Sequence, residues 1–550
     1  MLRRNFITSR RSILAGLAAS VAQGALAQEA SLIAPKTSAR PLARGEEGVA
    51  RPRPAPPPLP DLAEVIAAAG LSGQFSCVVA DAITGEVLES YQPTLALPPA
   101  SVAKSLTTLY ALDSLGPGYR FKTRVLATGP TVEGIIQGDI VLAGGGDPTL
   151  EADGLATLVA KLSQAGIEGV TGRLILVDAA LPRLRHIDSD QPDHVGYNPA
   201  ISGLNLNFNR VFFEWKRDSD GYDIVMEARA EGVRPSVDMA RMRVVDRSVP
   251  IYTYTALGGR DDWTVAKGAL GKGGGRWLPV RNPTLYAGEV FRTLARDKGI
   301  TLPAPQEGDM PASARVLAER SSADLRRILK DMLKYSTNLT AETVGLSASQ
   351  ARGLAVTSLT ESSAAMNQFL ASRYGMDGAA LVDHSGLGED SRVTSFAMAT
   401  GLARAGHQGP LPDLMKPVTP RDENGKAVSN SRVRIQAKTG TLNFASALAG
   451  YISAPGEREM TFAIFSANLE ERAKIPKEDR ERPEGSRAWN ARSRRLQRKL
   501  LTRWAKLPLD TRESRDTTEA LDNVDAPEPA NTTNTAISPG TPGTASIAAE

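Results

Sequence analysis

The stretch from Pro99 to Leu112 constrains the fold of this chain more than any other segment. Its apolar residues recur at helical spacing, and two prolines mark where the helix begins. Ser101 then lies in the first turn, and Lys104, three residues later, shares its face of the helix. A buried, partly neutral lysine can take the proton of a neighbouring serine and make it a nucleophile. The alternative is a helix-capping serine beside a solvated lysine.

Two later motifs favour the first interpretation. Ser336-Thr337-Asn338 follows a helical run over 325–333, and Lys438-Thr439-Gly440-Thr441 lies between two strand-like runs. A serine–lysine pair, S-x-N and K-T-G, in this order, resemble the signature set of penicillin-binding proteins and serine β-lactamases. Ser101 and Ser336 are 336 − 101 = 235 residues apart. If the motifs meet in one cleft, most of the sequence between them is therefore an insertion, long enough for two small domains.

Composition excludes several classes of protein. A chain of 550 residues is too long for one core, and 41% hydrophobic with 23% charged residues is ordinary for a globular protein. A net charge of only +4 gives no case for a nucleic-acid binder. Cys77 is the only cysteine and the four histidines lack ligand spacing, so we expect no disulfide, metal, cofactor or Ser-His-Asp arrangement.

The two ends of the chain differ from its middle. Residues 1–27 resemble a twin-arginine signal peptide, with Arg10-Arg11 before a short apolar run and an A-x-A site at 25–27. We therefore expect a periplasmic protein whose signal peptide is removed near Ala27. Residues 28–60 predict a Pro-rich linker, and 509–550 a disordered tail, because neither composition can pack a core.

Between these ends the pattern indicates mixed α and β structure. We expect a hairpin over 75–91, a strand over 203–215, and helices over 155–165, 283–299 and 486–504. The last of these helices is basic and amphipathic. Its apolar side either closes the core, which we favour, or makes weak contact with an anionic membrane surface.

Several segments together resemble class C low-molecular-mass penicillin-binding proteins, the D-alanyl-D-alanine carboxypeptidases/endopeptidases of the peptidase S13 (DacB, or penicillin-binding protein 4) family. Beyond the three motifs these are 144–148 (GGGDP), 204–209 (LNLNFN), 336–342 (STNLTAE), 383–387 (DHSGL) and 437–442 (AKTGTL). The resemblance covers roughly 62–505 and includes the long insertion.

This family implies a penicillin-recognising (serine β-lactamase-like) α/β sandwich with two nested, mainly β insertion domains. The corresponding division is a catalytic domain over 61–122 and 308–508, insertion domain II over 123–200 and 262–307, and insertion domain III over 201–261.

The resemblance also implies roles for the motif residues. Ser101 attacks the carbonyl between two terminal D-alanines, Lys104 takes its proton with help from the charge of Lys438, and Ser336 and Asn338 assist. The substrate is bound by the segment after Lys438, namely Thr439, Gly440, Thr441 and Asn443. The implied partners are peptidoglycan stem peptides and β-lactams, and the oligomeric state stays open.

The chain departs from the family pattern beside the S-G-L turn. His384 replaces a glycine, and Glu389 stands where the family has an arginine that binds the free end of diaminopimelate. Arg392 is the displaced candidate for that role, and Asp193 is the candidate for its partner aspartate. Two alternatives to a carboxypeptidase remain: a catalytically weak penicillin-binding or cell-wall-sensing protein, and a β-lactamase or esterase of the same fold.

Overall fold

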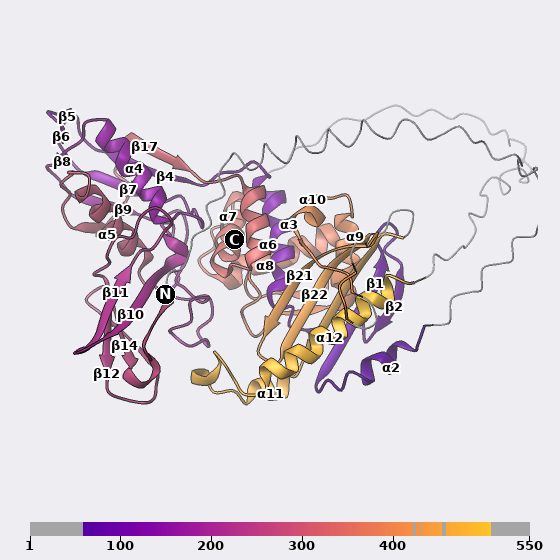
Figure 1. Ribbon diagram of the computed structural model, residues 1–550. Helices are drawn as coiled ribbons and strands as arrows, with labels where there is room; N and C mark the ends of the chain where they lie inside the picture. Colours follow the sequence, from indigo (N-terminus) through magenta and orange to yellow (C-terminus); the bar gives the residue numbers. More distant parts are fainter. Residues whose placement is uncertain (1–58, 422–424, 429–430, 454–457, 508–550) are drawn as a thin grey trace, which may run out of the picture. The chain divides into compact units, whose positions relative to one another are not determined.

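The computed structural model describes residues 59–421, 425–428, 431–453 and 458–507. Its largest sheet has six antiparallel strands, of which β1, β2, β21 and β22 are labelled in Figure 1. The strand order is β2-β1-β23-β22-β21-β20, so strands from the two ends of the described chain pair side by side. The strands are Gln74–Asp81 (β1), Val87–Tyr91 (β2), Lys416–Pro417 (β20), Arg434–Leu442 (β21), Ala445–Ser453 (β22) and Met460–Ala467 (β23). The hairpin expected over 75–91 is confirmed as β1 and β2.

Side chains along these strands point alternately to the two faces of the six-stranded sheet, and each face has its own hydrophobic core. On one face, Val78 and Ala80 of β1 pack with Phe465 of β23 against a layer of helices. That layer comprises α3 (Ala103–Leu115), α6 (Leu325–Tyr335), α7 (Asn338–Ala351), α8 (Leu359–Tyr374), α9 (Ser395–Ala405) and α10 (Pro410–Leu414). Lys104 on α3 and Lys438 on β21 both lie buried where this layer of helices packs on the sheet.

The opposite face of the sheet packs against α12 (Ser486–Trp504) and α2 (Leu62–Ala67). Cys77 and Val79 of β1 contribute to this second core. Trp504 is fully buried against Phe462, and its indole N–H donates to Glu89 Oε2 at 2.8 Å. Burial of each large apolar side chain contributes about 1.5–3 kcal/mol. The apolar side of α12 therefore closes this core, as the favoured interpretation predicts.

The insertion after α3 builds a second, five-stranded mixed sheet with the order β16-β9-β7-β4-β17. Its strands are Lys122–Ala127 (β4), Ile140–Ala143 (β7), Leu174–Val177 (β9), Pro305–Glu307 (β16) and Arg315–Ser321 (β17). Helices α4 (Ala152–Gln164) and α5 (Pro283–Arg296) share its hydrophobic core. Since β17 pairs with β4, this sheet runs past residue 307, where we placed the domain boundary.

Two three-stranded sheets continue the insertion. Their orders are β11-β10-β15 and β12-β14-β13. The strands are Arg210–Asp218 (β10), Gly221–Glu227 (β11), Ala240–Val245 (β12), Tyr252–Leu257 (β13), Arg260–Ala266 (β14) and Gly273–Pro279 (β15). The strand predicted over 203–215 is wrong in its first half, because Asn207, Phe208 and Asn209 have left-handed φ angles and form a turn.

The remaining described elements are short. They are β3 (Ala96–Leu97), β5 (Thr131–Val132), β6 (Ile135–Ile136), β8 (Gly169–Val170), β18 (Ala379–Ala380), β19 (Arg392–Thr394), α11 (Leu469–Ala473) and the 3₁₀ turns η1 (Ala100–Val102), η2 (Asn207–Asn209), η3 (Lys267–Ala269) and η4 (Lys477–Asp479). Among the described residues, no helix has the length and apolar character needed to span a bilayer. The predicted signal peptide, most of the linker and the whole predicted tail lie outside the described residues.

Candidate active site

The motif side chains come from five different elements. Ser101 lies in η1, and Lys104 lies in the first turn of α3. Ser336 caps the C-terminus of α6 with a left-handed φ of 61°, and Asn338 begins α7. Lys438 lies on β21. The structure therefore brings together all the side chains for which the sequence predicts a catalytic role.

Hydrogen bonds connect these side chains in two groups. Lys104 Nζ donates to Ser101 Oγ at 3.0 Å, to Asn338 Oδ1 at 2.7 Å and to the carbonyl of Ser385 at 2.8 Å. Lys438 Nζ donates to Ser336 Oγ at 3.0 Å and to the carbonyl of Thr439 at 2.7 Å. Each serine hydroxyl thus lies beside its own lysine, as an assisted nucleophile and a proton relay require.

Both serines open onto a cavity of about 340 Å³. The six-stranded sheet and the helices packed on its two faces, which we call the catalytic unit, contribute Asn338, Thr441, Asn443 and the first turns of α12 to its lining. The insertion contributes Gln191 and Tyr197. A chain segment outside the catalytic unit therefore forms part of the wall.

Two glycines allow the backbone before the nucleophile to pack closely. Ala100 has a left-handed φ of 46°, an uncommon conformation for a residue with a side chain. A Cβ on Gly440 would lie 2.6 Å from the carbonyl oxygen of Pro99, and one on Gly386 would lie 1.9 Å from that of Ala100. The glycines of the K-T-G and S-G-L motifs thus leave room for the turn that presents Ser101.

Burial lowers the pKa of Lys104, whose side chain is fully buried. The carboxyl groups of Glu342 and Asp383 act in the opposite direction. Burial also raises the pKa of Glu342, and the nearby Asp383 raises it further. Burial is thus the main reason why Lys104 can be a neutral base, whereas the sequence had suggested the charge of Lys438.

The pKa of Lys438 is lowered to about 7, first by burial and then by the positive charges of Lys104 and Lys416. The expected repulsion between the two motif lysines therefore lowers the pKa of Lys438 and is not among the causes that shift the pKa of Lys104. At neutral pH its ammonium is close to its titration point, so a bound anion would hold the proton on it.

His384, which stands where the family has a glycine, packs in the core. The side chain is fully buried, which lowers its pKa to about 3 and keeps the ring neutral. Its Nε2 is 2.7 Å from Ser362 Oγ, and the ring stacks on Tyr110. Gly345 of α7 makes room for it, since a Cβ there would lie 2.2 Å from the ring. The His384 ring thus fills a buried space beside α7.

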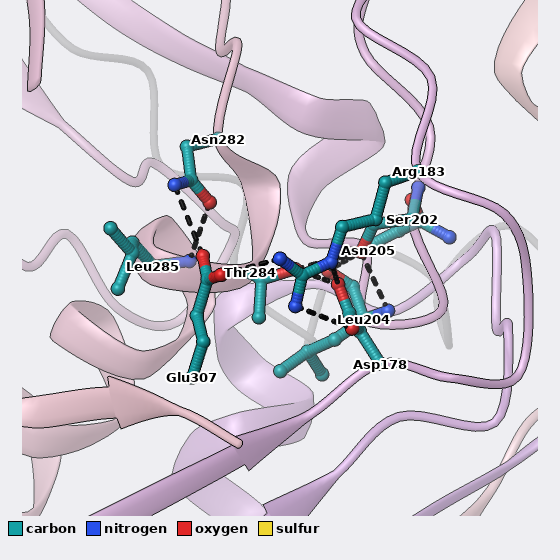
Figure 2. Close-up of polar contacts among 9 residues, drawn as sticks. All are labelled: Asp178, Arg183, Ser202, Leu204, Asn205, Asn282, Thr284, Leu285 and Glu307. Carbon is teal, nitrogen blue, oxygen red and sulfur yellow. Dashed lines mark hydrogen bonds and ion pairs between the residues drawn. The ribbon is translucent and has the colours of Figure 1, made fainter. Parts of the chain in front are cut away.

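The loop between Asp178 and Ser202 carries the insertion's share of the cavity wall, and a polar network holds both of its ends (Figure 2). At the first end, Arg183 donates to both carboxylate oxygens of Asp178, at 2.6 and 2.8 Å. At the second end, Ser202 Oγ lies 3.0 Å from Thr284 Oγ1, and Thr284 donates to Asp178.

The same loop binds directly to the catalytic unit. Asn338 Nδ2 donates to the carbonyl of Tyr197 at 2.9 Å, and Lys477 Nζ donates to that of Ser189 at 2.8 Å. The Asn338 amide therefore links Lys104 on one side to the insertion on the other.

Other predicted binding residues lie outside the lining of this cavity. The carbonyl of the exposed Asp193 accepts from Arg281 at 2.6 Å. Arg392 donates within its own turn, to the carbonyls of Glu389 and Ser391. Thr439 is exposed next to Lys438, and Gly440 is buried against Pro99. Thr441 and Asn443 do line the cavity.

Sequence reasoning missed two arginines in the cavity wall, Arg472 and Arg480. Each lies 3.3 Å from a carboxylate oxygen of Glu389, the residue that stands where the family has an arginine. Burial lowers the pKa of Arg472, and the charge of Glu389 opposes that shift. No local pattern marks these arginines, because only tertiary structure brings them to Glu389.

The fold and the site define a penicillin-recognising serine enzyme, with a serine–lysine pair in place of a catalytic histidine. The model of the D-Ala-D-Ala carboxypeptidase 3 (S13) family matches residues 59–483, and the chain belongs to this family.

Known proteins agree with this assignment. The chain is 29% identical over 446 residues to a D-alanyl-D-alanine carboxypeptidase of Actinomadura sp. strain R39, covering 74% of this chain and 80% of that protein. It is 28% identical over 456 residues to a Mycobacterium tuberculosis carboxypeptidase, covering 75% and 85%. The crystal structure of penicillin-binding protein 4 from Haemophilus influenzae has the same fold, with a TM-score of 0.64 at 18% identity over 81% of this chain and 99% of that one.

The close approach of β21 to η1 gives a first prediction. Gly440→Ala should lower the free energy of unfolding by about 1–3 kcal/mol, because the added methyl overpacks the contact with Pro99 and Ala100. Urea unfolding followed by circular dichroism measures this. Gly118→Ala is the matched control, since a Cβ there meets nothing within 4 Å. Equal stability of the two variants would contradict the prediction.

Proposed function

We propose that the protein is a periplasmic serine-type D-Ala-D-Ala carboxypeptidase/endopeptidase that acts on peptidoglycan stem peptides through an acyl-enzyme on Ser101. The observation that carries this proposal is the contact of Lys104 Nζ with Ser101 Oγ and Asn338 Oδ1 in one cavity, with the Ser336–Lys438 pair beside it. Membership of the S13 family and the signal-like residues 1–27 support it.

In the first half of the reaction Ser101 Oγ attacks the carbonyl carbon between the two terminal D-alanines. Neutral Lys104 takes the hydroxyl proton as the Oγ–C bond forms. The backbone N–H groups of Ser101 and Thr441 hold the resulting oxyanion. The C–N bond then breaks, and Ser336 gives its hydroxyl proton to the leaving amine. The proton that Lys104 accepted replaces the one lost by Ser336, so Lys104 is neutral again when D-alanine departs.

In the second half a water molecule attacks the ester carbonyl and gives its proton to Lys104. The C–Oγ bond breaks, and Ser101 regains its proton. Until D-alanine departs, Lys438 and Thr439 bind the terminal carboxylate of the substrate, a charge-assisted contact. A non-catalytic sensing protein has no need of this whole set of side chains.

A β-lactam should form the same ester, with its ring nitrogen as the leaving group that stays attached. Penicillin-binding protein 4 of Haemophilus influenzae has been crystallised in complex with a β-lactam, and that structure has a TM-score of 0.62 to this chain. We predict that benzylpenicillin adds one penicilloyl group to the wild type and none to Ser101→Ala. Intact-protein mass spectrometry measures this. An adduct that persists on Ser101→Ala would mean that another residue is the nucleophile.

Lys104→Arg should lower the acylation rate by several orders of magnitude. A guanidinium keeps the charge but does not give up its proton in proteins, so the base is lost. Stopped-flow acylation with a chromogenic cephalosporin measures the rate, and Lys474→Arg at the exposed end of α11 is the control. If Lys104→Arg acylates at the wild-type rate, Lys104 is not the base.

Lys438→Arg should instead change the pH dependence of substrate binding. The pKa of Lys438 is about 7 in the free enzyme, so its charge is present below that pH and is lost above it. KM for a D-Ala-D-Ala peptide should therefore rise with pH above about 7 in the wild type. In Lys438→Arg the KM should stay flat, because the guanidinium remains charged. The same rise in both proteins would show that another group titrates.

A further inference from the structure

A groove of about 820 Å³ lies between α2 and α12, on the face of the sheet opposite the layer of helices that carries Lys104. One wall is apolar and is formed by Leu59, Pro60, Val65 and Ala68. The other wall is basic and is formed by Arg421, Arg495, Arg498 and Lys499. We call these four cations the basic wall.

The charges of the basic wall are not neutralised within the described part of the chain. No carboxylate there forms an ion pair with any of the four cations, whereas the neighbouring Arg503 pairs with Glu89 at 2.6 Å. Glu64 is the one acidic residue of the lining. Burial, and then the positive charges of Arg421, Arg494 and Arg495, lower the pKa of Arg498. The basic wall therefore suits an anionic occupant.

The chain itself supplies such an occupant immediately after the groove. The described residues end at Leu507, and Lys506 lines the groove. In the sequence beyond, acidic residues recur at every third position, at Asp516, Glu519, Asp522, Asp525 and Glu528. No basic residue interrupts this run, and Leu521 and Val524 lie within it with the same spacing. The segment thus offers both the charge and the apolar side chains that the two walls match.

We propose that the acidic segment 516–528 of this chain occupies the groove between α2 and α12. Asp516 is 516 − 507 = 9 residues beyond Leu507, and nine extended residues reach about 30 Å, enough to return along α12. The tether keeps the segment at a high effective concentration, so modest contacts suffice. This inference does not depend on the proposed function, because it uses none of the residues around Ser101.

Cross-linking of the full-length protein with a carbodiimide tests the proposal. The reagent joins a lysine amine to a carboxylate that is already in contact with it. Peptide mapping by mass spectrometry should find Lys499 joined to carboxylates of 516–528, and the exposed Lys298 of the insertion joined to none of them. The yield should be independent of protein concentration. It should fall severalfold near 1 M salt, where the Debye length is about 3 Å.

Charge reversal provides the matched variants. R495E/R498E should abolish the Lys499 cross-link, and replacement of the five acidic residues by lysine in that background should restore contact, now to the carboxylates at 495 and 498. Cys77 reports folding in each variant, because it is fully buried and burial raises the pKa of its thiol to about 12. A thiol reagent should leave it unmodified in every folded variant.

Three results would overturn the proposal. One is the absence of a Lys499 cross-link to 516–528 at low salt in folded protein. Another is a cross-link whose yield rises with protein concentration, since the occupant is then the tail of a second copy. The third is equal binding of phosphatidylglycerol vesicles by the wild type and by a variant with the five acidic residues neutralised, together with loss of that binding in R495E/R498E. The occupant is then an anionic lipid surface.

Discussion

The burial of one ammonium group is the constraint on which the site depends. Lys104 Nζ donates to a hydroxyl, a side-chain amide and a backbone carbonyl, which come from η1, α7 and the turn at Ser385. A buried amine that lost one of these partners would carry a penalty of about 1–3 kcal/mol. The three elements are therefore held at fixed positions around the amine. The same burial that makes Lys104 costly to place also lowers its pKa, as the proposed role of a base requires.

Two buried carboxyl groups limit how far burial lowers the pKa of Lys104. Glu342 accepts from the backbone N–H groups of His384 and Ser385, each at 2.9 Å, and Asp383 accepts from those of Gly386 and Gly388 at 2.6 Å. Together they shape the turn that supplies the carbonyl to Lys104. Their negative charge also keeps the pKa of Lys104 from falling further. One pair of side chains thus sets both the geometry and the basicity of the site.

The sequence predicts which side chains the structure brings together around Lys104 and Lys438, because each motif is short and lies on or next to a regular element. Ser101, Ser336 and Lys438 need only a helix start, a helix end and a strand to be placed correctly. The long insertion and α12 are equally visible, as spacing and as helical periodicity.

No short sequence motif marks the other residues of the cavity wall. Arg472 and Arg480 reach Glu389 from segments far along the chain, and Tyr197 enters through a loop whose course is set by the buried Asp178 network. The strand predicted over 203–215 is likewise wrong at the left-handed turn 207–209, because alternation of apolar residues does not reveal the sign of φ. The features that the sequence pattern did not predict thus depend on long-range ion pairs and on local backbone conformation.

The loop pinned by Asp178 has a consequence for how such an enzyme diversifies. Because Gln191 and Tyr197 belong to the insertion and yet line the cavity, exchanging the insertion between relatives also exchanges part of the substrate's surroundings. The hydrogen bonds from Asn338 and Lys477 to carbonyls of this loop depend on backbone position and not on side-chain identity. These two contacts would therefore persist if the side chains of Ser189 and Tyr197 changed, whereas the contact of His194 with Glu481 would not survive a change of that histidine. The insertion can thus alter the cavity wall in part without altering how the loop is held.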